Sequence, residues 1–110
     1  MGPGFRRDDG VVGMREREPC VYVMASGQRG TLYVGVTSNL LKRVWEHKSD
    51  VVGGFTNDYH VHRLVWFERH DSMHAAIVRE KTIKEWRRIW KIELIGKSNP
   101  EWRDLYPELV

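Results

Sequence analysis

The sequence predicts one α+β domain in which a small antiparallel sheet is covered by helices. Two segments rich in Val, Tyr and Thr, residues 20–26 and 31–37, enclose Gly27-Gln28-Arg29-Gly30, which has the composition of a hairpin loop. A third aromatic and β-branched run at 62–68 is expected to join the hairpin as a third strand. Stretches of helical periodicity follow the second and third strands. The expected order is therefore β-β-α-β-α, with the last helix open to division into two.

The amino-acid composition excludes several classes of protein. The chain has 110 residues, of which 41% are hydrophobic and 30% charged, so it fits one globular domain and excludes whole-chain disorder. Its apolar runs are far shorter than the roughly 20 residues of a membrane-spanning helix, and no signal-type core follows the start. A single cysteine, Cys20, excludes an internal disulfide and a cysteine-based zinc site. We expect a cytoplasmic protein with no membrane partner.

The expected domain covers residues 19–105. Residues 1–18 are rich in Gly and Arg without apolar periodicity and are expected to be a flexible leader, with residues 106–110 as a tail. Thr37 or Ser38 is expected to cap a first helix that ends near Lys48. Asp71 or Ser72 is expected to cap the long helical stretch, which bends near Trp86 and stops at Gly96. The segment from His60 to His62 lacks a third metal ligand and is interpreted as strand surface.

The hairpin gathers two phenols on one face of the sheet. Its loop places Tyr22 opposite Gly35 and Met24 opposite Tyr33, so Tyr22 and Tyr33 are diagonal neighbours roughly 6 to 8 Å apart. Gly35 would leave an empty place beside them. The feature predicts either a pocket wall or an aromatic pair that fills a core, and the pattern alone does not decide between them.

The two helical stretches carry charged residues in unusual places. Glu80 lies near the centre of an apolar helical stripe, where a carboxylate needs a salt bridge, with Lys84 for example, or a bound cation such as Mg²⁺. Arg43 and His47 stack one helical turn apart and could hold a phosphate and move a proton, although a solvated basic face is the commoner explanation. The tryptophans are interpreted as core residues more readily than as base-stacking platforms.

A net charge of +3 favours a polyanionic partner. The basic residues gather mainly in the two helical stretches. The candidates for contact with nucleic acid are Gly35, Lys42, Lys84, Arg87 and Arg88.

Taken together, these positions resemble the GIY-YIG nuclease family along the whole stretch from about Pro19 to Leu105. The two tyrosine motifs of the family correspond to Cys20-Val21-Tyr22 and Tyr33-Val34-Gly35, and its late asparagine to Asn99. The remaining matches are the first-helix segment Thr37-Ser38-Asn39-Leu40 with Arg43 and His47, the loop residues Phe55-Thr56 and Tyr59, the second-helix segment Arg79-Glu80-Lys81, and the ending from Asn99 to Leu105.

The resemblance implies an endonuclease that acts on DNA, in repair or recombination, and leaves 5′-phosphate and 3′-hydroxyl ends. One divalent cation, Mg²⁺ or Mn²⁺, would be held on Glu80, and Arg43 would neutralise charge on the phosphoryl oxygens. One of the two phenols, helped by His47, would activate or orient the attacking water. Asn99 would hold the pocket or the phosphate by hydrogen bonds.

Two alternatives stay open at the level of sequence. Cys20 replaces the first glycine of the first motif and would strain a positive φ angle, which favours a nucleic-acid-binding module that no longer cuts. A protein-interaction domain that uses exposed tryptophans is the other alternative. The chain carries no added DNA-reading module, so we expect selection of DNA shape rather than of sequence. The oligomeric state is not predicted.

Overall fold

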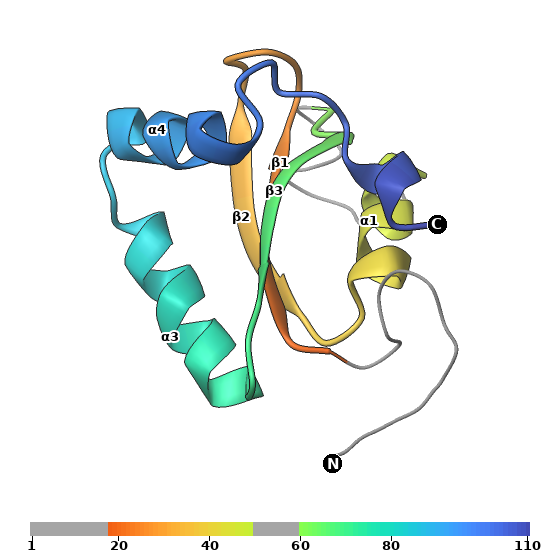
Figure 1. The fold of residues 1–110 in the computed structure, drawn as a ribbon, viewed down its shortest axis with the longest axis vertical. Coiled ribbons are helices and arrows are strands. Elements are labelled where there is room, and N and C mark those ends of the chain that lie inside the picture. Colours follow the sequence, from red (N-terminus) through yellow and green to blue (C-terminus); the bar gives the residue numbers. More distant parts are fainter. Residues whose placement is uncertain (1–17, 50–59) are drawn as a thin grey trace.

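A computed structural model describes residues 18–49 and 60–110 of the chain. Figure 1 shows a sheet with helix α1 on one side and helices α3 and α4 on the other. The three strands are arranged in the order β2-β1-β3, and this α+β layout confirms the predicted fold class. The elements in chain order are β1 (Cys20–Ala25), β2 (Leu32–Thr37), α1 (Leu40–Lys48), β3 (Arg63–Arg69), α3 (Met73–Lys84), α4 (Arg88–Ser98) and the short 3-10 helix η1 (Tyr106–Glu108).

The β1–β2 hairpin has the predicted register, with Tyr22 paired to Gly35 and Met24 to Tyr33. A four-residue turn closes it, in which the Gly30 N–H donates to the Gly27 carbonyl at 2.9 Å. Arg29 takes the left-handed conformation with a φ of 55°. The turn fixes the pairing, and because side chains alternate along a strand, the pairing also fixes which residues share a face.

Strand β3 pairs with β1 in antiparallel fashion, and the register shifts between Val23 and Met24. It begins at Arg63 rather than at His62. His60 lies in the turn before it with a φ of 55°, so the pair of histidines leads into the strand instead of lying on its surface. A left-handed residue cannot continue an extended strand.

Each face of the sheet buries its own apolar cluster. One cluster joins Tyr22 and Met24 of β1 to Leu40 and Val44 of α1. The opposite face joins alternate residues of β1, such as Val21, to side chains of α3, α4 and the segment after them. The sheet therefore separates what the helix α1 contacts from what α3 and α4 contact.

The first helix is capped by Asn39, not by Thr37 or Ser38. The Asn39 side chain accepts the backbone N–H of Lys42 at 3.2 Å. Thr37 is the last residue of β2, and its Oγ1 accepts the backbone N–H of Asn39 at 3.0 Å. Two polar side chains thus share the tight exit from strand to helix.

The long helical stretch is divided, as the sequence left open. Ser72 caps α3 by accepting the Ala75 N–H at 3.1 Å. The stretch breaks between Lys84 and Arg88, where Arg87 has an extended backbone with a ψ of 149°. Gly96 does not stop the second helix, which continues to Ser98. The helix ends where Asn99, with a φ of −146°, leaves the helical conformation.

The C-terminal residues return to the α1 face, where Leu109 is buried beside η1. Asp104 accepts the backbone N–H groups of Leu64 and Tyr106 and forms an ion pair with Lys48, which ties this segment to the sheet and to α1. Within 18–49 and 60–110 no helix has the length and apolar character needed to cross a bilayer. Residues 1–17 of the predicted leader and the loop matches Phe55-Thr56 and Tyr59 lie outside the described residues.

Candidate active site

The centre of the candidate site is a buried contact between Tyr22 and His47. The Tyr22 hydroxyl and His47 Nε2 are 2.9 Å apart, and both side chains are almost fully buried. The Tyr33 ring lies 6.3 Å from the Tyr22 ring and 5.2 Å from the His47 ring, measured between centroids. The predicted spacing of the two phenols is confirmed, and α1 adds the histidine to them.

The expected vacancy beside Gly35 does not exist. A Cβ atom placed on Gly35 would lie 2.6 Å from both Cζ and the hydroxyl oxygen of Tyr22. The phenol therefore crosses directly over the glycine to reach His47. The absence of a side chain at Gly35 makes room for Tyr22 rather than for a ligand.

Arg43 places a positive charge beside this phenol. Its guanidinium group is close enough to the Tyr22 hydroxyl to lower the pKa of that phenol, against the larger effect of burial, and it donates to Glu46 Oε1 at 3.1 Å. A cation beside the phenol oxygen favours donation of the phenol proton away from it, and His47 Nε2 is the acceptor within reach. This arrangement favours the neutral His47 tautomer that carries its proton on Nδ1, a buried atom with no partner in the described parts of the chain.

The protonation states follow from burial. Burial raises the pKa of Tyr22 well above its ordinary value of 10, so the phenol stays protonated at neutral pH. Burial, and then the positive charge of Arg43, lower the pKa of His47 to about 4. Burial is the largest single influence on Arg43 and lowers its pKa, but the interactions with Tyr22, Glu46 and Tyr33 together outweigh it, so the pKa of Arg43 is raised. At neutral pH the site thus holds a neutral imidazole, a neutral phenol and a fixed cation.

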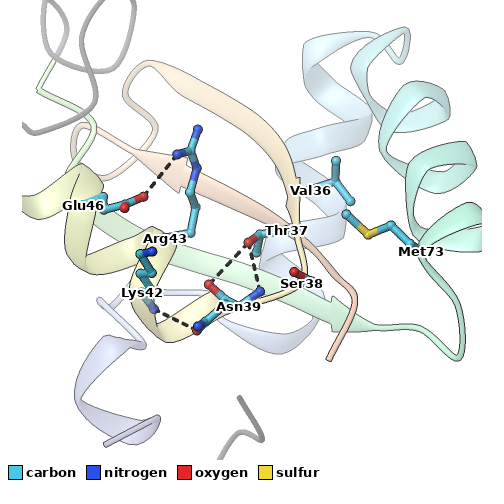
Figure 2. A pocket seen from close by; sticks show the side chains of 8 residues that line it. All are labelled: Val36, Thr37, Ser38, Asn39, Lys42, Arg43, Glu46 and Met73. Atoms are coloured by element: carbon cyan, nitrogen blue, oxygen red, sulfur yellow. Dashed lines mark hydrogen bonds and ion pairs between the residues drawn. The ribbon is translucent and has the colours of Figure 1, made fainter. Parts of the chain in front are cut away.

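Arg43 also lines an open pocket of about 510 Å³ at the exit of β2. Figure 2 shows Lys42, Arg43 and Glu46 of α1 on one side, and Val36 and Met73 on the other. Glu46 was not among the predicted site residues, although its spacing of three residues from Arg43 is the signal of a helical ion pair. The turn between β2 and α1 forms the rest of the lining, with Thr37, Ser38 and Asn39.

Glu80 lies on the other face of the sheet. It is buried in the row of α3 that includes Ala76 and Ile83, and its Oε2 is 2.6 Å from Lys84 Nζ. The predicted apolar stripe and the alternative of a salt bridge to Lys84 are both confirmed. Met73, the first residue of α3, reaches the pocket of Arg43, and Glu80 follows it by about 10 Å along the helix axis.

The Asn99 side chain is buried and links the end of α4 to β3 by hydrogen bonds. Its amide nitrogen donates to the carbonyls of Val65 and Arg103, and its side-chain oxygen accepts the Arg103 N–H. These three contacts are all with the backbone. They hold the turn that contains Trp102, which has a φ of 55° and is buried against the core.

The basic candidates have different surroundings. Lys42 is exposed at the rim of the pocket. Arg88 donates to the carbonyls of Arg29 and Gly30, both at 2.7 Å, and so supports the hairpin turn. Arg87 lies over the Trp90 ring, 5.6 Å from its centroid. Lys84 is engaged by Glu80.

The donor set is compatible with a lightly coordinated divalent cation. No cluster of three or more His, Cys, Asp or Glu occurs among residues 18–49 and 60–110. The candidate ligand Glu80 supplies one carboxylate, and Mg²⁺ commonly uses one or two protein carboxylates and keeps its waters. Lys84, with about half of its side chain exposed, is free to move away.

Comparison with known proteins identifies the family. The profile of the GIY-YIG catalytic domain matches residues 18–93. The chain is 39% identical over 82 residues to a UPF0213 protein of Syntrophus aciditrophicus, in an alignment that covers 74% of this chain and 92% of that protein. A UPF0213 protein of Natronomonas pharaonis is 39% identical over 76 residues, which is 69% of this chain and 88% of that one. No solved structure matches the chain significantly. The chain belongs to the GIY-YIG family of nuclease domains.

Proposed function

We propose that this chain is a divalent-metal-dependent endonuclease that hydrolyses DNA phosphodiester bonds to 5′-phosphate and 3′-hydroxyl ends, in DNA repair or recombination. The observation that carries the proposal is the buried contact between the Tyr22 hydroxyl and His47, with the partly exposed guanidinium group of Arg43 beside it. A purely structural core rarely buries two such polar groups beside a cation, because each buried group must be desolvated.

Arg43 binds the scissile phosphate. Its guanidinium group borders the open pocket, and about a third of its side chain is exposed. The paired N–H groups of arginine match two phosphate oxygens, and their charge stabilises the charge that develops there. Lys42 at the rim holds a neighbouring phosphate. Glu46 orients the guanidinium group until DNA arrives.

Tyr22 and His47 move the proton. As the attacking water gives a proton to the Tyr22 oxygen, the Tyr22 hydroxyl proton passes to His47 Nε2, which becomes imidazolium. The Arg43 charge lowers the pKa of His47 in the free protein. A phosphate bound to Arg43 offsets that charge, so substrate binding makes His47 a stronger base. Tyr33 orients the water from the neighbouring strand.

Glu80 holds the single cation, Mg²⁺ or Mn²⁺, which when bound would polarise the phosphate and stabilise the leaving oxygen. Asn99 keeps α4 and the following turn in place against β3, a supporting role in agreement with its backbone contacts. The alternative is a binding module of the same fold that does not cut. Its one sequence argument was strain at Cys20, and Cys20 lies in a regular strand outside the residues of positive φ.

The test is a nicking assay with the full chain on supercoiled plasmid and on branched DNA, with Mg²⁺, with Mn²⁺ and with a chelator. The expected result is metal-dependent nicking whose products carry 5′-phosphates and can be resealed by a ligase. Arg43→Lys is the matched variant, because lysine keeps the charge and loses the planar fork. It should cut at least about 100-fold more slowly, which also excludes a contaminating nuclease.

Failure to nick any substrate, by a folded chain that binds DNA, would favour the non-cutting module. Cleavage that persists unchanged in Arg43→Lys would remove Arg43 from the reaction.

A further inference from the structure

The bend between α3 and α4 exposes an aromatic groove on the surface. Trp86 in the bend and Trp90 in the first turn of α4 meet edge to face, with ring centroids 6.3 Å apart and planes at 82°. They line a groove of about 310 Å³ with Leu94 and the charged residues Glu93 and Lys97. Trp90 is 46% exposed. An indole so exposed has one face available to a ligand.

Three cationic side chains lie beside the tryptophans or line the groove, together with one carboxylate, that of Glu93. The guanidinium carbon of Arg79 lies 5.4 Å from the Trp86 centroid, and that of Arg87 lies 5.6 Å from the Trp90 centroid. Lys97 lies at the other end. From Lys84 to Ser98 the chain carries five basic and two acidic residues. Aromatic rings next to cations are what a base and its phosphates require together.

Hydrogen bonds and core packing hold the residues around the groove in place. Lys91 donates to the Lys84 carbonyl at 3.2 Å across the bend, and Arg88 is bonded to the hairpin turn. Trp86 also packs against the buried cluster of Val21 and its neighbours. The rings are therefore held in place before a ligand arrives, which lowers the entropic cost of binding.

We propose that the groove of Trp86 and Trp90 stacks an unpaired base of a DNA substrate, while Arg87 and Lys97 contact the adjacent phosphates. The inference rests on the proposed function for the identity of the ligand as DNA. It adds a substrate class, namely duplex DNA with a single-stranded segment. The cations favour DNA over an apolar partner helix, since such a helix would leave Arg87 and Lys97 without anions.

The experiment measures binding without cleavage. Fluorescence anisotropy with a chelator present gives the dissociation constants for a blunt duplex and for the same duplex with a single-stranded extension. Trp90→Ala should weaken binding of the extended duplex about 10-fold, the effect of losing one stacked base, and leave the blunt duplex unchanged. Trp90→Phe keeps an aromatic face and should restore most of the difference.

Two matched controls separate stacking from general damage. Ile89→Ala removes a side chain of similar exposure from the same helix, and Trp45→Ala removes an exposed indole from α1. Neither should change the preference for the extended duplex.

Equal losses on both DNA forms in Trp90→Ala, or no loss on either, would overturn the stacking site. The binding result is independent of the nicking assay, because no cleavage is measured. A protein that does not cut can still show the preference, and a protein that cuts can lack it.

Discussion

At the scale of single residues, Gly35 determines where Tyr22 can lie. Strand propensity alone predicts that a side chain at Gly35 would be tolerated. The structure reverses this expectation, because a Cβ atom there would overlap a buried phenol that is fixed by His47. Relief requires Tyr22 to leave its hydrogen bond or the strands to separate.

Gly35→Ala should therefore destabilise the fold by about 1 to 3 kcal/mol, the usual cost of overpacking, and reduce cleavage by displacing Tyr22. Thermal unfolding and the nicking rate measure the two effects. Gly27→Ala is the matched control, because a Cβ on Gly27 meets nothing within 4 Å. Native stability in Gly35→Ala would mean that the phenol does not cross the glycine.

His47 gives a second prediction at this scale, through the pH dependence of stability. Its pKa is about 4 in the folded chain, against an ordinary value of 6.5. Between pH 4 and pH 6.5 the unfolded chain binds a proton at His47 that the folded chain does not bind. The contribution of neutral His47 to the free energy of unfolding is therefore complete above about pH 6.5 and is lost as the pH falls toward 4. The expected loss is at most about 3 kcal/mol.

His47→Gln keeps a hydrogen-bonding side chain and cannot titrate. Urea unfolding of both proteins across this pH range should show a steeper loss of stability in the wild type. Parallel curves would show that His47 titrates normally, and the proposed neutral base would then lose its support.

At the scale of secondary-structure elements, the sequence predicts what is local. The hairpin register and the shared face of Tyr22 and Tyr33 follow from the turn and the alternation of side chains. The predicted cap of α1 was wrong because Thr37 and Asn39 compete for one turn, and only the backbone conformation decides between them. The predicted stop at Gly96 was wrong because a glycine ends a helix only where a left-handed residue is needed.

Helix α3 carries a prediction of its own, since Glu80 stands in its buried row with an exposed partner. Glu80→Gln keeps the size and removes the charge. Cleavage should be abolished while the melting temperature stays unchanged or rises, because a desolvated charge is removed and Lys84 can reach solvent. The nicking assay and thermal unfolding measure both.

Glu85→Gln, an exposed change just after the same helix, should alter neither property. A Glu80→Gln variant that cuts at the wild-type rate would leave Glu80 as the ion-pair partner of Lys84 and nothing more.

At the scale of the whole molecule, the candidate residues divide between the two faces of the sheet. Tyr22, Tyr33 and His47 lie with α1, whereas Glu80 and Asn99 lie with α3 and α4. Periodicity predicts which face of an element is buried, but not which element covers it. The sequence could therefore indicate the candidate residues and the hairpin pair, but not the contact of His47 with Tyr22 or the backbone role of Asn99.

The balance of charge over the whole molecule sets the last prediction, the salt dependence of DNA binding. Although the chain is basic, many of its cations are already paired with carboxylates in the structure. Examples are Arg79 with Glu68, Lys48 with Asp104, Lys84 with Glu80, and Arg103 with Glu108. Arg43 is also paired, with Glu46, but this pair borders the open pocket. The cations assigned to phosphates are Lys42, Arg43, Arg87 and Lys97. About four phosphate contacts predict a slope near −4 in a plot of log affinity against log salt concentration.

Anisotropy titrations in a chelator, over a range of salt concentrations, measure this slope. Lys42→Gln should make it shallower by about one, because one phosphate contact is lost. Lys48→Gln should leave it unchanged, since the Lys48 ammonium group is engaged by Asp104, and Asp104 keeps its two backbone N–H partners without it. A much steeper slope, or an equal effect of both variants, would mean that DNA displaces the internal ion pairs and covers far more of the surface than the pocket and the tryptophan groove.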